Sequence, residues 1–206
     1  EVDGHAFQAV NTKPGDIKFK DLSGPDGNPD GIIDGYDRTI TGNDVPYITY
    51  GLNLSANYKN FDFSVLGQGV ADVDVYLTSE ASQAFFNGAG VKRYALNRWT
   101  AENPDPNAAY HRLLQSADNA QNMKGSSFWL YDADYFRIKS VTLGYTLPKS
   151  VVEPLNIANL RFYVSSNNLF TVRADKRMKD FDPEMATSRA SYPQMKSFSF
   201  GVNLTF

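Results

Sequence analysis

The last ten residues, SFSFGVNLTF from Ser197 to Phe206, alternate strictly between two kinds of side chain. The residues of one parity are small and polar: serine, glycine, asparagine and threonine. Because successive side chains of a β-strand point to opposite faces, this stretch predicts a strand with one apolar and one polar face. The apolar face consists of Phe198, Phe200, Val202, Leu204 and Phe206.

The same alternation predicts four further strands, at 47–58, 61–69, 135–147 and 159–170. In the third of these, Phe136 and Ile138 have the opposite parity from the apolar residues that follow. This shift indicates either a β-bulge near Ser140 or a strand that leaves the membrane at that point. A sixth strand is expected at 16–21.

The alternation indicates an all-β fold, but the strands of a soluble sandwich would alternate as well. Strand length and composition favour the other candidate, an antiparallel transmembrane β-barrel segment. The longest predicted strands run to about 12 residues, near the ~9–11 that cross a bilayer at a tilt. Their polar faces suit a wet lumen, and aromatic residues lie near their ends, as in an interfacial girdle.

The connections between the strands fit a barrel whose last residue lies at the periplasmic rim. The turns at 59–60 and 148–158 are then short and periplasmic, and the segments 21–46, 70–134 and 171–196 become long extracellular loops. Five or six strands cannot close a barrel, which takes about eight. We therefore expect the amino-terminal part of the same protein to complete it.

Composition excludes several classes of function. The 206 residues carry a net charge of -3 with scattered Lys and Arg, which excludes nucleic acid as a partner. No cysteine is present, so disulfides and zinc-thiolate sites are excluded, and no apolar run approaches the ~18 residues of a membrane helix. His5 and His111 lie far apart, and Ser126 lacks nucleophile-elbow glycines. We expect no catalytic residues and no enzyme.

A twelve-residue acidic stretch, DGNPDGIIDGYD at 26–37, matches the EF-hand calcium loop with Asp at its last position. Hard cations prefer oxygen ligands, and the spacing of this motif places its oxygen-bearing residues around one ion. The alternative is a turn-rich loop that uses its carboxylates for local hydrogen bonds. We predict Ca²⁺, with Mg²⁺ as the other candidate, in a structural role. The predicted ligands are Asp26, Asn28, Asp30, the carbonyl of Ile32, Asp34 and Asp37.

Aromatic residues gather in and beside the long loop at 70–134, where a helix is expected within 79–99. Such rings could stack on sugars or pack against a lid protein, and the alternative is packing within the loop itself. The predicted contacts with substrate or lid are Trp99, Tyr110, Trp129 and Tyr131.

Several motifs in order resemble the SusC/RagA family of TonB-linked outer-membrane transporters. They are GDIKFKD at 15–21, NRWT at 97–100, ADYFRIK at 133–139, NNLF at 167–170 and DPE at 182–184. The resemblance covers nearly the whole chain from about residue 14.

The resemblance implies the last strands of a barrel of about 22 strands, with an internal plug, in the bacterial outer membrane. It further implies TonB as the energy source, a SusD-like surface lipoprotein as the lid, and import of glycans or oligopeptides. The competing interpretation is a soluble or surface binding module, a β-sheet stabilised by calcium.

Overall fold

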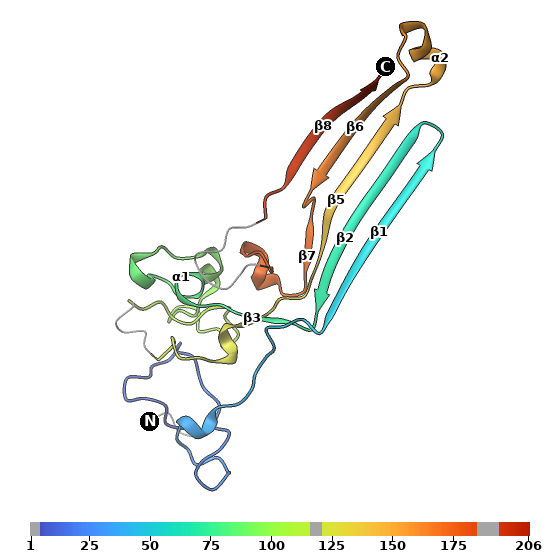
Figure 1. Cartoon of the computed structure of the whole chain (residues 1–206). Helices are drawn as coiled ribbons and strands as arrows, with labels where there is room; N and C mark the ends of the chain where they lie inside the picture. Colours follow the sequence, from blue (N-terminus) through green and yellow to red (C-terminus); the bar gives the residue numbers. More distant parts are fainter. Residues whose placement is uncertain (1–4, 116–120, 185–193) are drawn as a thin grey trace. The chain divides into compact units, whose positions relative to one another are not determined.

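The computed structural model describes residues 5–115, 121–184 and 194–206 (Figure 1). Parts of two expected loops, 116–120 and 185–193, lie outside the described residues. The chain forms two compact units, which we call the loop unit and the sheet unit. The loop unit comprises Glu1–Asp44, Asp74–Tyr131 and Ala186–Ser191, and the sheet unit comprises Val45–Val73, Asp132–Met185 and Tyr192–Phe206.

The sheet unit is an antiparallel sheet with the strand order β1-β2-β5-β6-β8, and the short β7 pairs with β5. All five predicted strands are confirmed. Figure 1 shows the long strands side by side, with α2 and the carboxyl terminus at the end where β1 turns into β2. The strands are β1 (Ile48–Tyr58), β2 (Phe61–Ala71), β5 (Tyr135–Thr146), β6 (Asn159–Asn167), β7 (Thr171–Arg173) and β8 (Ser197–Thr205).

The two connections at this end are short, as the sequence predicts. Lys59 and Asn60 alone join β1 to β2, and Lys59 takes the left-handed conformation (φ 53°) that a tight turn requires. Asn60 Nδ2 donates to the Thr146 carbonyl at 2.8 Å, which ties this turn to the end of β5. Between β5 and β6 lie α2 (Lys149–Val152) and a 3₁₀ turn (Glu153–Leu155).

The loop unit is built from short elements joined by irregular backbone. Its regular elements are the 3₁₀ turn Gly35–Asp37, α1 (Ser79–Ser82), and the 3₁₀ turns Phe86–Gly88, Arg93–Asn97 and Ser127–Trp129. β3 (Asp74–Tyr76) pairs with β4 (Leu130–Asp132) in a two-stranded sheet. A further 3₁₀ turn, Lys176–Asp180, follows β7 in the sheet unit.

One expectation for the loop unit is wrong. No strand forms at 16–21, because side chains take up its backbone groups: the Ile17 N–H donates to Asn122 Oδ1 and the Phe19 N–H to Gln8 Oε1. The helix expected within 79–99 is present as α1, but it ends after four residues. Phe85 (φ 63°) and Asn87 (φ 50°) adopt left-handed conformations, which a continuous helix excludes.

A β-bulge in β5 explains the parity shift in the sequence. Leu66 of β2 pairs with Ser140, whereas the next residue, Gly67, pairs with Ile138. Lys139 is therefore the extra residue, and the first of the two sequence alternatives is confirmed. The bulge turns Arg137 to the polar face of the sheet and leaves Phe136 on the apolar face.

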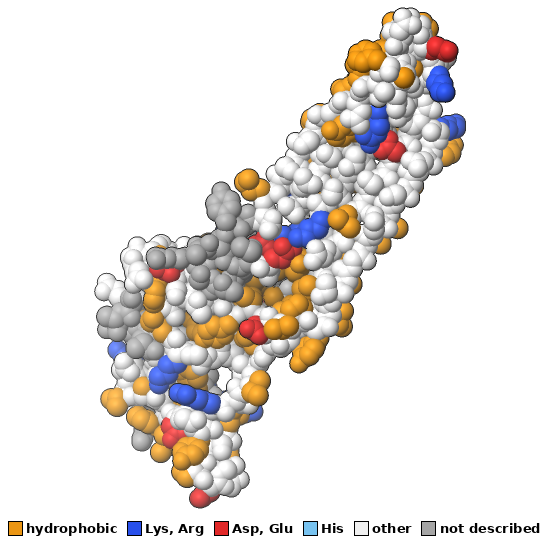
Figure 2. Space-filling model, in the orientation of Figure 1, with side chains coloured by type: hydrophobic (Ala, Val, Ile, Leu, Met, Phe, Trp, Pro, Cys, Tyr) orange, Lys and Arg blue, Asp and Glu red, His pale blue; other side chains and the backbone are white. Residues whose placement is uncertain are grey.

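One face of the sheet is predominantly polar across the long strands, with Leu66 and Val70 of β2 as apolar exceptions. Directly paired residues share a face, and on this side Ser55 pairs with Ser64, Thr142 with Ser165, and Ser165 in turn with Ser199. Figure 2 shows a side of the strands on which white surface, from small polar side chains and backbone, predominates and blue and red side chains adjoin.

The opposite face is apolar and has no cover within the described chain. Leu54 of β1 is 53% exposed, Phe63 of β2 40% exposed and Phe200 of β8 85% exposed. Their cross-strand neighbours are also aliphatic or aromatic, with Val65 beside Leu54 and Val164 beside Phe200. A sheet of this kind requires an apolar environment on one side.

Within the described residues, no helix has the length and apolar character needed to cross a membrane.

Candidate functional site

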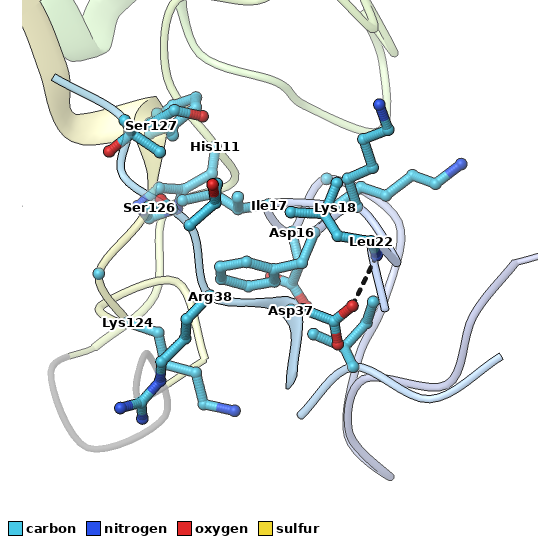
Figure 3. Close-up of a pocket in the computed structure, with 18 of the residues that line it drawn as sticks. Asp16, Ile17, Lys18, Leu22, Asp37, Arg38, His111, Lys124, Ser126 and Ser127 are labelled. Carbon is cyan, nitrogen blue, oxygen red and sulfur yellow. Dashed lines mark hydrogen bonds between the residues drawn. The ribbon is translucent and has the colours of Figure 1, made fainter. Parts of the chain in front are cut away.

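The loop unit encloses a cavity of about 1520 Å³ between segments far apart in the sequence. Its walls come from within 15–22, 33–41, 99–111 and 124–128, together with Tyr76. Figure 3 shows side chains of this lining, including Lys18, Arg38 and Lys124, whose ammonium and guanidinium groups contribute positive charge. The cavity therefore combines basic groups with aromatic surface.

A hydrogen-bonded group at Asp16 fixes the amino-terminal wall of the cavity to the rest of the loop unit. Arg112 donates from Nε to Asp16 Oδ1 at 2.6 Å, and Asn122 Nδ2 donates to the same oxygen at 2.8 Å. Burial alone would raise the pKa of Asp16, but the hydrogen bonds from Arg112 and Asn122 outweigh it and hold the pKa below its usual value. This carboxylate is therefore charged and structural.

Two of the four predicted aromatic contacts, Tyr110 and Trp129, belong to the hydrophobic core of the loop unit. Trp129 and Tyr110 are each 1% exposed and meet edge to face with ring centroids 5.7 Å apart. Tyr131 is equally buried, so the packing alternative describes its contacts within this chain. Trp99 and Tyr110 line the cavity, and the Trp99 ring covers Gly15 so closely that a side chain at Gly15 would collide with it.

His111 is buried in the same aromatic core. Its ring stacks on Tyr110 at a centroid distance of 4.2 Å and meets Trp129 edge to face. Nδ1 lies 2.6 Å from the Arg112 carbonyl, so Nδ1 carries the proton and Nε2 keeps a lone pair. Burial lowers the pKa of His111 to about 4, and the imidazole is neutral at physiological pH.

The predicted metal loop is closed by bonds from backbone N–H groups to its carboxylates. Asp37 accepts from the N–H groups of Leu22 at 2.6 Å and Asp34 at 2.8 Å, the first of which Figure 3 shows. The bond from the Asp34 N–H is the main reason that the pKa of Asp37 is lowered. Gly31 adopts φ 84°, as the chain reversal at this position of the motif requires.

The oxygen-rich donors of this loop fit a hard cation chemically. In the described residues, however, no three His, Asp or Glu side chains are gathered closely enough to hold a metal ion. Asp30 Oδ1 instead accepts from the Ile32 N–H at 3.0 Å, and Asp34 Oδ1 accepts from Tyr36. The ion and its six ligands remain a prediction.

The sequence did not reveal a second charged group, which lies on the polar face of the sheet unit. Arg137 of β5 is 1% exposed and donates from Nη2 to Asp182 Oδ1 at 2.7 Å. Glu184 accepts from Lys139 Nζ at 2.7 Å and lies 3.3 Å from Arg137 Nη1. The motifs at 133–139 and 182–184 supply these residues, but only the fold shows that they pair.

Comparison with known proteins finds similarity to TonB-dependent receptors. No family model matches. The TonB-dependent receptor P3 of Formosa agariphila is 27% identical over 99% of this chain and 20% of the receptor. TonB-dependent receptor SusC of Bacteroides thetaiotaomicron is 25% identical over 98% of this chain and 19% of the receptor. The chain therefore spans about a fifth of the length of the curated relatives it matches.

Solved structures give the same result for the fold. The RagAB peptide importer in its closed-closed state matches 89% of this chain and 20% of its own with a TM-score of 0.65 and 25% identity. The open-open state matches 88% of this chain with a TM-score of 0.64 and 24% identity. The homologous receptors are transporters of the outer membrane and are not enzymes. The chain is thus homologous to the SusC/RagA-type TonB-dependent receptors over about a fifth of their length.

Proposed function

We propose that this chain forms the carboxyl-terminal strands and outer loops of a TonB-dependent importer, in a transmembrane barrel of about 22 strands. The observation that carries the proposal is the sheet with one exposed apolar face and one polar face. The apolar face would contact lipid and the polar face would line the lumen. β1 and β8, the outer strands of the described sheet, would pair with further strands of the same receptor, since unpaired edges are excluded from lipid.

The lengths of the connections support one orientation in the membrane. Short connections and the end of β8 lie at one end of the sheet, which is the periplasmic end in such barrels. The loops at 21–46, 70–134 and 171–196 would then face the cell exterior. An internal plug and the contact with TonB would belong to the rest of the receptor.

The cavity of the loop unit is the proposed region of contact with substrate or lid. Trp99 and Tyr110 line it, Trp129 packs with Tyr110 in the core, and Tyr131 is buried in the same unit. We propose glycans or oligopeptides as substrates and a SusD-like surface lipoprotein as the lid. Support comes from the homology to SusC and from the structural match to RagAB.

Calcium, or in its place magnesium, would bind the acidic loop at 26–37. The proposed ligands are Asp26, Asn28, Asp30, the Ile32 carbonyl, Asp34 and Asp37. A divalent cation there would supply positive charge that holds the carboxylates together. Its role would be to stiffen a long outer loop.

Isolation of the full-length receptor from native outer membranes tests the proposed function. We expect heat-modifiable migration, dependence on detergent, and co-purification of a SusD-like lipoprotein. Recovery of the full-length protein in the soluble fraction, monodisperse in plain buffer, would instead support the calcium-stabilised binding module.

A further inference from the structure

The charged group on the polar face of the sheet unit has more positive than negative side chains. Arg137, Lys139 and Arg173 are the cations, and Asp182 and Glu184 are the anions. Hydrogen bonds from Arg137 and from the backbone N–H groups of Gln194 and Glu184 overcome the effect of burial and lower the pKa of Asp182. The Asp182 carboxylate is therefore charged, and the group holds three basic side chains against two acidic ones.

Arg173 is the cation that has no carboxylate of its own. Its Nε donates to the Phe181 carbonyl at 3.1 Å and Nη1 to the Thr171 carbonyl at 3.4 Å. No carboxylate of the described residues lies within ion-pair distance of Arg173, and the segment 185–193 contains no Asp or Glu. Burial penalises the charge of this half-buried guanidinium and, despite the favourable charge of Asp182, lowers the pKa of Arg173.

A small cavity of about 160 Å³ adjoins this guanidinium. Its lining holds three basic side chains against two acidic ones, namely Arg137, Arg173 and Lys179 against Asp180 and Asp182. The cavity is therefore a polar space with a net positive wall. An anion that entered it could pair directly with Arg173, which no carboxylate of the described residues does.

Another lining residue offers a neutral hydrogen bond beside the positive charge. Asn168 donates from Nδ2 to the Met195 carbonyl at 3.0 Å, which leaves its Oδ1 to accept a hydrogen bond. The carboxyl end of a peptide presents a carboxylate next to an N–H donor. Arginine suits the first and an amide oxygen suits the second.

We propose that this cavity binds the terminal carboxylate of an oligopeptide, with Arg173 as the recognising cation. The inference rests on the proposed function and deepens it, since it gives the imported substrate a charge and a chemical class. Arg137 would hold the loop in place through Asp182 and take no direct part in recognition. The polar face then selects substrate as well as conducting it.

The test uses the full-length receptor and a pair of labelled pentapeptides of one sequence, ending in a free carboxylate or a carboxamide. We expect the wild type to bind the free acid about tenfold more tightly, a difference of about 1.4 kcal/mol. Arg173→Gln should abolish this preference while leaving the amide unchanged, and Arg173→Lys should restore part of it. Arg177→Gln is the matched control, because Arg177 lies on the same segment, pairs with Asp175 and does not line the cavity.

Two outcomes would overturn the proposal. One is that Arg173→Gln prefers the free acid to the amide by the same affinity ratio as the wild type. The absence of any such preference in the wild type would overturn the proposal equally. The other is an Arg173-dependent uptake of acidic oligosaccharides with no dependence for peptides. Heat-modifiable migration and co-purification of the SusD-like lipoprotein are measured on the same receptor preparations. If both are present, a negative peptide result counts against the carboxylate site and not against the proposed function.

Discussion

Arg161 of β6 reaches across the whole width of β5 to form a two-pronged ion pair with Asp62 of β2. Arg161 Nε donates to Asp62 Oδ1 at 2.8 Å, and Nη2 bonds Oδ2. The strand between them carries Gly144, directly opposite Asp62. A Cβ at Gly144 would collide with both members of the pair. Because Gly144 has no side chain, it leaves room for this ion pair between two strands that are not adjacent in the sheet.

Gly144→Ala should break this ion pair and lower the thermal stability of the full-length receptor slightly. Both partners are partly exposed, so the loss should stay within about 1 kcal/mol. Gly51→Ala on the same face is the control, because its added Cβ would meet only ordinary van der Waals contact. The melting temperatures of the two variants, compared in one detergent, check the prediction, and equal values would contradict it.

Phe200→Arg should impair assembly of the receptor, whereas Ser199→Arg should be tolerated. Phe200 lies on the apolar face opposite Val164, and Ser199 lies on the polar face opposite Ser165. A charge on the lipid face costs about 2–4 kcal/mol near the middle of the bilayer. The measurement is the heat-modifiable fraction in outer membranes. Equal defects in both variants would refute the proposed lipid face.

Deletion of Lys139 should straighten β5 without exchanging its faces. Once the extra residue is removed, Ile138 directly precedes Ser140 and still pairs with Gly67, so Arg137 stays opposite Gln68 on the polar face. The deletion and Lys139→Ala both lose the partly exposed pair with Glu184, worth at most about 1 kcal/mol, so both variants should assemble. Surface yield of folded receptor is the measurement, and a deletion variant that fails to assemble while Lys139→Ala succeeds would show that the bulge itself is required.

Acidification should loosen the loop unit through His111. Its folded pKa of about 4 lies below the ordinary value of 6.5, so the contribution to stability is complete above pH 6.5 and declines as the pH falls towards 4. The loss is on the order of 3 kcal/mol. Hydrogen exchange of residues 108–114 at pH 7 and pH 4.5 measures it. His111→Phe should flatten the dependence, whereas His5→Gln should retain the wild-type slope.

Chelation should accelerate proteolysis within 21–46 and leave the strands protected, if the acidic loop holds its metal. Asp26→Asn tests metal binding without disturbing the hydrogen bonds inside the loop, because the Asp26 carboxylate makes no hydrogen bond with the described residues. Asp37→Asn weakens three backbone contacts as well, and should speed cleavage with or without chelator. Equal cleavage of wild type and Asp26→Asn in calcium would count against the site.

The strands could be predicted well from the sequence because the alternation of apolar and polar residues lies within each short segment. One face of β8 reads directly from Phe198 to Leu204, and the shift at Ile138 located the bulge. The loop unit was harder, since Asp16 finds its partner at Arg112 across the chain. Such pairing depends on tertiary contacts, which the periodicity of a short segment cannot predict.

The extra residue at Lys139 gives β5 two phases within one strand. Toward the carboxyl end the even positions face the polar side, and toward the amino end the odd positions do. A homologue lacking this one residue would keep both halves of the strand in phase, because Ile138 and Ser140 already face opposite sides of the sheet. The loss of a residue here should therefore be tolerated in relatives, whereas a single insertion or deletion inside a regular long strand would exchange the two faces over part of that strand.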